Sequence, residues 1–143
     1  MHFSRRLLLA AAATTVLSAC GTMRSDTVRL GGTLTGAQEV PPVATAGTGT
    51  LDATFDKSTR KLTYTVTHSG LSGPATAGHF HGPAAPGTNA GVVVPFANAA
   101  SPIHGEATLT EAQAADLLAG RWYVNIHTQA HPGGEIRAQV TPR

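Results

Sequence analysis

Three histidines carry the clearest chemical signal in this chain. His79 and His81 stand two apart in residues 75–81, a run that reads as a β-strand, and His127 lies near the end of a second such run, residues 122–128. Residues i and i+2 of a strand point to the same face, so the first two imidazoles should lie side by side. Imidazole suits copper, zinc and related transition metals. If the two strands are neighbours, the sequence predicts one site for copper, or for zinc, with these three ligands.

Strand phase places the three histidines away from the apolar core. Phe80 separates His79 from His81, and His127 is out of phase with the apolar positions of its own strand while sharing a face with Asn125. The histidines should therefore lie on the faces opposite their strands' largest apolar residues. The alternative is that they are surface or strand-pairing residues with hydrogen-bonding roles only.

Further side chains could complete such a site. His104 at a strand start and His131 in a turn are weaker candidate ligands. Ligating imidazoles are usually oriented by a second hydrogen bond, for which Asn125, Glu135 and Gln139 are available. No Gly-x-Ser-x-Gly element occurs and the chain has a single cysteine, so no catalytic nucleophile is predicted.

The elements that must position these residues are mostly short strands. Residues 47–55 and 61–68 alternate apolar and polar side chains around a turn, and a second hairpin is expected from 122–128 and 135–140. A first strand over 28–35 should be broken or bulged at Gly31-Gly32. One short helix is expected at about 110–119, because Thr110 and Gln113 form a capping box. The pattern predicts an all-β fold, an antiparallel Greek-key sandwich or flattened barrel.

The N-terminus reads as an export signal. Residues 1–19 contain a basic leader and an apolar core, followed by Leu17-Ser18-Ala19-Cys20, which is typical of a bacterial lipoprotein cleavage site. We therefore expect a lipid on Cys20, a tether over 20–27 and one domain over 28–143. An ordinary secretory signal is the alternative, and Arg5-Arg6 leaves twin-arginine export open. The protein should be anchored in the cell envelope facing the periplasm, with the outer membrane favoured, or at the cell surface.

Charge argues against nucleic acid as a partner. The chain has ten Lys and Arg against eight Asp and Glu, but Arg5 and Arg6 would leave with the signal. The remaining chain is formally neutral, whereas nucleic-acid binding needs a basic face. The expected partners are the membrane, through the lipid on Cys20, and a protein or a metal that the sequence does not identify.

Four ordered motifs resemble the CHRD domain, first described in chordin and common in bacterial envelope proteins. The resemblance covers about residues 28–141 and implies an all-β, immunoglobulin-like domain, but no established activity. The motifs are Leu34-x-Gly36-x-Gln38-Glu39-Val40-Pro41-Pro42-Val43, Ala77-Gly78-His79-Phe80-His81-Gly82-Pro83, Leu118-x-Gly120-x-x-Tyr123-Val124-Asn125-Ile126-His127-Thr128 and Pro132-Gly133-Gly134-Glu135-Ile136-Arg137.

A more distant similarity points to the copper–zinc superoxide dismutase fold. His79, His81, His127 and Arg137 stand in the order of that family's copper ligands and of a later arginine, so the similarity implies a copper-type three-histidine site with Arg137 beside it. The zinc-binding loop, the extended electrostatic loop and the disulfide cysteines are missing, so dismutase activity is not implied.

Three functions remain open from the sequence. A binding module that takes a partner or a metal is favoured over a mononuclear copper redox enzyme, because no general acid or base with a substrate pocket can be identified. A purely structural surface module is the third possibility.

Overall fold

The computed structural model describes residues 26–143. The expected signal peptide, the lipid site at Cys20 and most of the tether lie outside these residues. The described chain forms nine strands, one α-helix and one 3-10 turn: β1 Thr27–Thr35, η1 Gly36–Gln38, β2 Thr48–Asp56, β3 Lys61–Ser69, β4 Ala75–His81, β5 Val92–Pro95, β6 Ile103–Thr108, α1 Glu111–Leu118, β7 Tyr123–Thr128, β8 Ile136–Gln139 and β9 Thr141–Pro142. The all-β prediction with one short helix is confirmed.

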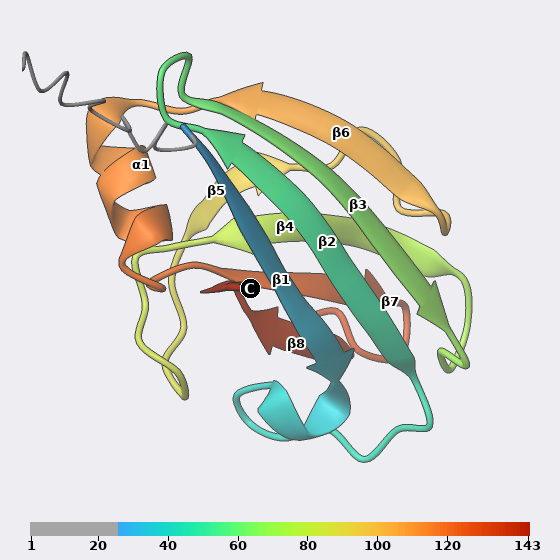
Figure 1. Cartoon of the computed structure of the whole chain (residues 1–143). Helices are drawn as coiled ribbons and strands as arrows, with labels where there is room; N and C mark the ends of the chain where they lie inside the picture. Colours follow the sequence, from blue (N-terminus) through green and yellow to red (C-terminus); the bar gives the residue numbers. More distant parts are fainter. Residues whose placement is uncertain (1–25) are drawn as a thin grey trace, which may run out of the picture.

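The strands form one antiparallel sheet that folds over into two layers. Their order is β5-β4-β7-β8-β1-β2-β3-β6, and the short strand β9 pairs with β1 at Leu30 and Gly31. Figure 1 shows β1, β2, β3 and β6 in front of β4, β7 and β8. The two layers are connected where Thr35 of β1 pairs with Arg137 of β8. The result is a flattened, nearly closed barrel.

The hairpin of β2 and β3 forms as predicted. Its register is unbroken from Thr48↔Ser69 to Asp56↔Lys61. The turn is held by Asp56, whose Oδ1 accepts hydrogen bonds from the backbone N–H groups of Ser58 and Thr59 at 2.8 and 3.1 Å. Alternation along the two strands turns every second side chain toward the other layer, where the apolar ones are buried.

Strand β1 differs from the prediction, because it is not broken at its two glycines. Gly31 pairs with Asp52 and Gly32 with Leu51 in a continuous ladder. A Cβ on Gly32 would be 2.8 Å from the backbone oxygen of Gln139. The glycines therefore allow the C-terminal segment to lie against the strand, a reason that local sequence patterns do not reveal.

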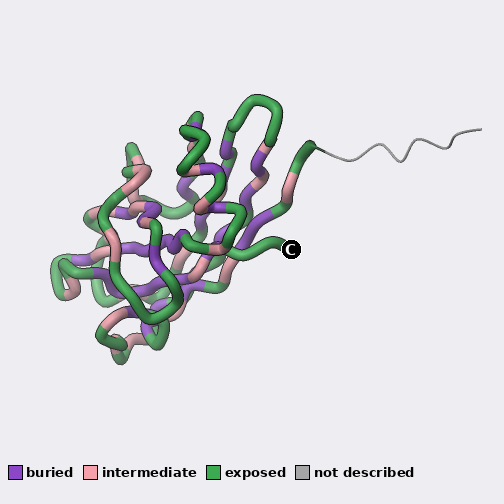
Figure 2. The backbone as a smooth tube through the Cα atoms, turned by 90° about the vertical axis from the view of Figure 1, so that its left-hand side faces the viewer, coloured by how far each residue is buried: buried purple, intermediate pink, exposed green. Residues whose placement is uncertain are grey.

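The core lies between the two layers. In Figure 2 the buried segments of the backbone lie in the middle of the domain, while most loops are exposed. Phe80 of β4 is fully buried and meets Tyr64 of β3 edge to face, with ring centroids 5.0 Å apart. Burying a side chain of this size contributes about 1.5–3 kcal/mol. The same burial fixes the strand's phase and turns His79 and His81 toward the outer face.

Helix α1 connects the two layers between β6 and β7. Thr110 Oγ1 accepts from the Gln113 backbone N–H, and the Gln113 side chain accepts from the Thr110 backbone N–H, so the predicted capping box is present. Gly120 has φ +71° and ends the helix. Among residues 26–143, no helix is long and apolar enough to cross a membrane.

Candidate metal site

The three histidines predicted from strand phase converge on the outer face of β4 and β7. These strands are neighbours, with Ala77 opposite His127 and His79 opposite Asn125. One ring nitrogen from each of His79, His81 and His127 lies within 4.8 Å of the other two. We call these three residues the histidine cluster.

The cluster is partly open to solvent. His81 is buried at 7% exposure, whereas His79 and His127 are half-buried. Nδ1 of His79 is 3.1 Å from Nε2 of His127. Two ligands bound tetrahedrally at the usual metal–nitrogen distance of about 2.1 Å are about 3.4 Å apart. This pair therefore already has nearly the spacing that one ion requires.

Hydrogen bonds select which nitrogen of each ring faces the shared space. Nδ1 of His81 lies 3.0 Å from the carbonyl oxygen of Ala90, and Nδ1 of His127 lies 2.9 Å from that of Pro132. A carbonyl only accepts, and a neutral imidazole has one N–H, so the tautomer with the proton on Nδ1 satisfies both carbonyls. Each Nε2 then presents a lone pair, which is the orientation that backbone carbonyls impose on metal-binding histidines.

Asn125 lies between the two Nε2 atoms. Its Oδ1 is 3.0 Å from Nε2 of His81 and 2.9 Å from Nε2 of His127, and its side chain is buried. With the proton on Nδ1, three electron-pair donors face one another in this space. A cation among them would relieve the conflict, because it accepts electron pairs from all three.

Burial favours the uncharged state of two cluster histidines. Desolvation, followed by the charge of His127 and then that of His81, lowers the pKa of His79. Desolvation is also the largest influence on His81, and it lowers the pKa of that ring against hydrogen bonds to Ala90 and Asn125 that raise it. Neutral imidazole is the form that binds metals.

Tyr123 and Arg137 support His81 from one side. The rings of His81 and Tyr123 are parallel, with centroids 4.6 Å apart, and Arg137 Cζ lies 3.4 Å from the Tyr123 ring centroid. Arg137 donates to Thr88 O at 2.6 Å and to Asn89 Oδ1 at 2.9 Å. The superoxide dismutase similarity predicted Arg137 beside the site. In the structure this buried arginine holds the loop that carries Ala90.

Glu39 is the residue that the sequence reasoning missed. It is 5% exposed, the Asn125 amide lies against its carboxyl group, and its Oε1 has no hydrogen-bond partner among residues 26–143. Burial raises the pKa of Glu39, while the charge of Arg137 and hydrogen bonds from Asn125 and Val40 lower it. The available signal in the sequence was its place in the Gln38-Glu39-Val40-Pro41-Pro42 motif, but alternation rules do not apply to loops and so do not predict its burial.

Glu135, expected to orient a histidine, bonds elsewhere. Its carboxylate accepts from the hydroxyl groups of Thr45, Ser72 and Thr128 at 2.6–2.7 Å, and from the Ser72 backbone N–H at 2.8 Å. Burial opposes ionisation, but these hydrogen bonds outweigh it and lower the pKa of Glu135 to about 2. Glu135 therefore anchors two loops to the sheet. Gln139 likewise bonds to Ala84 O and Gly120 O, not to a histidine.

The other histidines among residues 26–143 lie outside the cluster. His104 is on β6 in the other layer, exposed, with Nδ1 3.0 Å from Thr65 Oγ1. His68 contacts Ala99 O at 2.8 Å from the end of β3. His131 lies in the β7–β8 turn and is not among the residues whose ligand atoms converge. The two weaker candidate ligands are thus not brought to the site.

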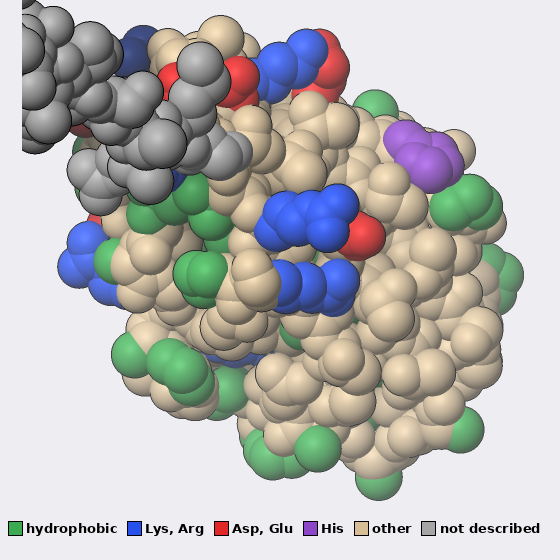
Figure 3. Space-filling view, viewed as in Figure 1, with side chains coloured by type: hydrophobic (Ala, Val, Ile, Leu, Met, Phe, Trp, Pro, Cys, Tyr) green, Lys and Arg blue, Asp and Glu red, His purple; other side chains and the backbone are tan. Residues whose placement is uncertain are grey.

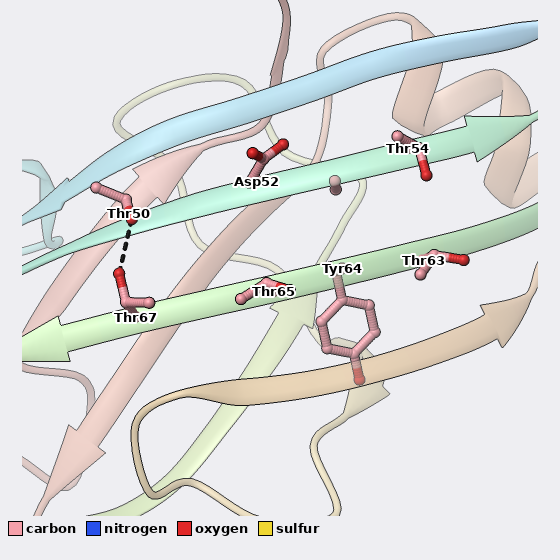
Figure 4. Close-up of a pocket in the computed structure, with 8 residues that line it drawn as sticks. Thr50, Asp52, Thr54, Thr63, Tyr64, Thr65 and Thr67 are labelled. Atoms are coloured by element: carbon pink, nitrogen blue, oxygen red, sulfur yellow. Dashed lines mark hydrogen bonds between the residues drawn. The ribbon is translucent and has the colours of Figure 1, made fainter.

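A prominent hollow on the described surface lies away from the histidines. It has a volume of about 470 Å³ and lies over the outer face of β2 and β3, lined mainly by threonines (Figure 4). Thr50 and Thr67 are hydrogen-bonded across it at 2.7 Å. The face in Figure 3 carries mostly uncharged groups with few charged side chains among them. A shallow threonine surface without converging ionisable groups offers no evident chemistry.

Comparison with known protein families identifies the family of this chain. The model of the CHRD domain matches residues 30–140, which is most of the chain and all of the sheet except its ends. The chain belongs to the CHRD domain family. The resemblance stated from four motifs is confirmed. No curated protein and no solved structure matches the chain significantly.

Proposed function

We propose that this protein is an envelope lipoprotein whose CHRD domain binds one copper or zinc ion through His79, His81 and His127. The observation that carries the proposal is the convergence of one nitrogen from each ring within 4.8 Å. The backbone carbonyls of Ala90 and Pro132 support it, because each can accept from Nδ1 of its ring and so leave Nε2 of His81 or His127 free to bind an ion.

The donor set suits these metals. Neutral imidazole nitrogens bind both copper and zinc, and affinity among first-row divalent ions is greatest for copper. A bound copper ion would supply a redox-active centre, and zinc a Lewis acid. The chain's own residues supply orientation: two carbonyls hold the Nδ1 sides of His81 and His127, and Tyr123 stacks on His81.

Calorimetric titration of the purified protein with Cu(II) and with Zn(II) tests the proposal. We expect about one equivalent of metal for the wild type, and none for a His79→Ala/His81→Ala/His127→Ala variant. His104→Ala is the matched control, because it removes an exposed histidine of the other layer. Equal uptake by the triple variant and the wild type would refute the site.

The membrane anchor is a separate part of the proposal. It rests on the sequence around Cys20, which lies outside the described residues. We expect the wild type in the membrane fraction and a Cys20→Ser variant displaced from it, with processing blocked by globomycin. A Cys20→Ser variant that fractionates like the wild type would contradict lipidation while leaving the metal site untouched.

A redox activity of the copper-loaded protein is the second candidate. The partial exposure of His79 and His127 favours it, since a small oxidant could approach from that side. Superoxide turnover that disappears in the triple histidine variant would support an enzyme. Stoichiometric copper binding without turnover would favour a binding module.

A further inference from the structure

One buried oxygen, Oδ1 of Asn125, lies beside two nitrogens of the histidine cluster. Asn125 Oδ1 is 3.0 Å from Nε2 of His81 and 2.9 Å from Nε2 of His127. These distances, like the 3.1 Å between the His79 and His127 nitrogens, approach the edge of about 3.4 Å expected for a tetrahedral site. With respect to His81 and His127, the oxygen thus has the spacing of a further ligand to the same ion.

The orientation of the Asn125 amide decides whether this oxygen is available. The side chain has an acceptor end and a donor end of nearly equal size, and rotation by a half turn exchanges them. The donor end lies against Glu39, whose carboxyl group accepts a hydrogen bond from the Asn125 side chain, and both groups lie close to Gly134. A carboxyl oxygen that carries no proton accepts hydrogen bonds but cannot donate one, so the observed contact favours the amide nitrogen toward Glu39 and the oxygen toward the imidazoles.

We propose that Asn125 Oδ1 is the fourth donor of the metal site and that Glu39 is the positioning residue that aims it. This inference rests on the proposed metal binding by the histidine cluster. It adds an amide oxygen to the three nitrogens and gives a function to the buried carboxyl group of Glu39. The protein itself then fills four positions around the ion, an arrangement typical of stable binding sites rather than of open catalytic ones.

Two substitutions at position 125 test the fourth donor. Asn125→Asp keeps an oxygen in place, whereas Asn125→Ala removes it. For Co(II) and Zn(II) titrations we expect Asn125→Asp to match or exceed the wild-type affinity, and Asn125→Ala to bind about 10–100-fold more weakly. The visible absorption of bound Co(II), intense for four-coordinate ions, should be kept in the first variant and weakened in the second.

A double-mutant cycle tests the positioning role of Glu39. Glu39→Gln should weaken metal binding about tenfold in the wild-type background, because glutamine no longer selects one amide orientation. An aspartate at position 125 presents an oxygen in either orientation and needs no aiming. In the Asn125→Asp background, Glu39→Gln should therefore not weaken binding, and it should strengthen binding to the extent that it removes repulsion between the two carboxylates. A merely structural role of Glu39 in its loop would cost the same in both backgrounds.

The outcomes separate the two proposals. If wild type and Asn125→Ala show equal affinity and equal Co(II) spectra while the triple histidine variant binds nothing, the fourth donor is refuted and the three-histidine site stands. If the wild type binds no metal, both proposals fall. Circular dichroism of the metal-free variants checks folding, and the Asn125→Asp cycle decides the question if Asn125→Ala does not fold.

Discussion

Glu39 occupies the space that a side chain at Gly134 would need. A Cβ on Gly134 would lie 2.3 Å from Glu39 Oε1, far below any ordinary contact. Gly134 also has φ +126°, a conformation that side-chain-bearing residues rarely adopt. The second glycine of Pro132-Gly133-Gly134 therefore lets the β7–β8 turn close over the carboxyl group and amide behind the histidine cluster.

Gly134→Ala should destabilise the fold and disturb the site together. Backbone strain and the clash with Glu39 predict a loss of about 1–3 kcal/mol in the free energy of unfolding. Urea denaturation measures this loss, and metal titration should show weaker binding. Gly133→Ala is the matched control, because nothing lies within 4 Å of its Cβ. Equal stability of the two variants would contradict the packing described.

Glu135 should make the fold acid-sensitive over a defined range. Its pKa of about 2 in the fold lies below the ordinary value of 4.5, so its contribution is complete above about pH 5 and is lost as pH falls toward 2. The difference is worth about 3 kcal/mol. Urea unfolding of Glu135→Gln at pH 7 should show a loss of this size and a flatter decline between pH 5 and 2.

Glu106→Gln is the control for this experiment. Glu106 is exposed and pairs with exposed Lys61, so its loss should cost less than about 1 kcal/mol. If both glutamine variants show the same pH profile, the hydrogen bonds from Thr45, Ser72 and Thr128 do not hold Glu135 ionised.

Arg137→Lys should loosen the loop above the histidine cluster. Lysine cannot reproduce the two hydrogen bonds to Thr88 O and Asn89 Oδ1 or the stacking on Tyr123. We expect a loss of about 2–4 kcal/mol in stability, as for breaking a buried charged network. Hydrogen exchange should become faster at residues 88–90. Arg121→Lys, at an exposed pair with Asp116, should leave both quantities nearly unchanged.

Metal should stabilise the folded chain if the proposed site exists. An ion that binds only the native state, at 100 times its dissociation constant, adds about 2.7 kcal/mol and raises the Tm by roughly 10 °C for a domain of this size. Thermal unfolding with and without Zn(II) measures the shift, and EDTA should reverse it. A His81→Ala variant with the full zinc-dependent shift would argue that the ion binds elsewhere.

Local sequence patterns determined most of the elements of this domain. Alternation located the β2–β3 and β7–β8 hairpins, and the Thr110–Gln113 capping box located α1. The same period placed His79 and His81 on one face, because Phe80 between them is the side chain that gains most from burial. These features depend on neighbours within a few residues, which a sequence records directly.

The tertiary structure alone decided what surrounds the histidines. The pairing of β4 with β7 brings His127 to His79, and the loop from η1 to β2 brings Glu39 to Asn125. Glu135 was expected to orient a histidine, but it bonds to the distant loops that carry Thr45 and Ser72. Gly31-Gly32 continues a strand, because the C-terminal segment needs the space that side chains would fill there. Each of these outcomes depends on a contact between segments far apart in the chain, so no local periodicity could specify it.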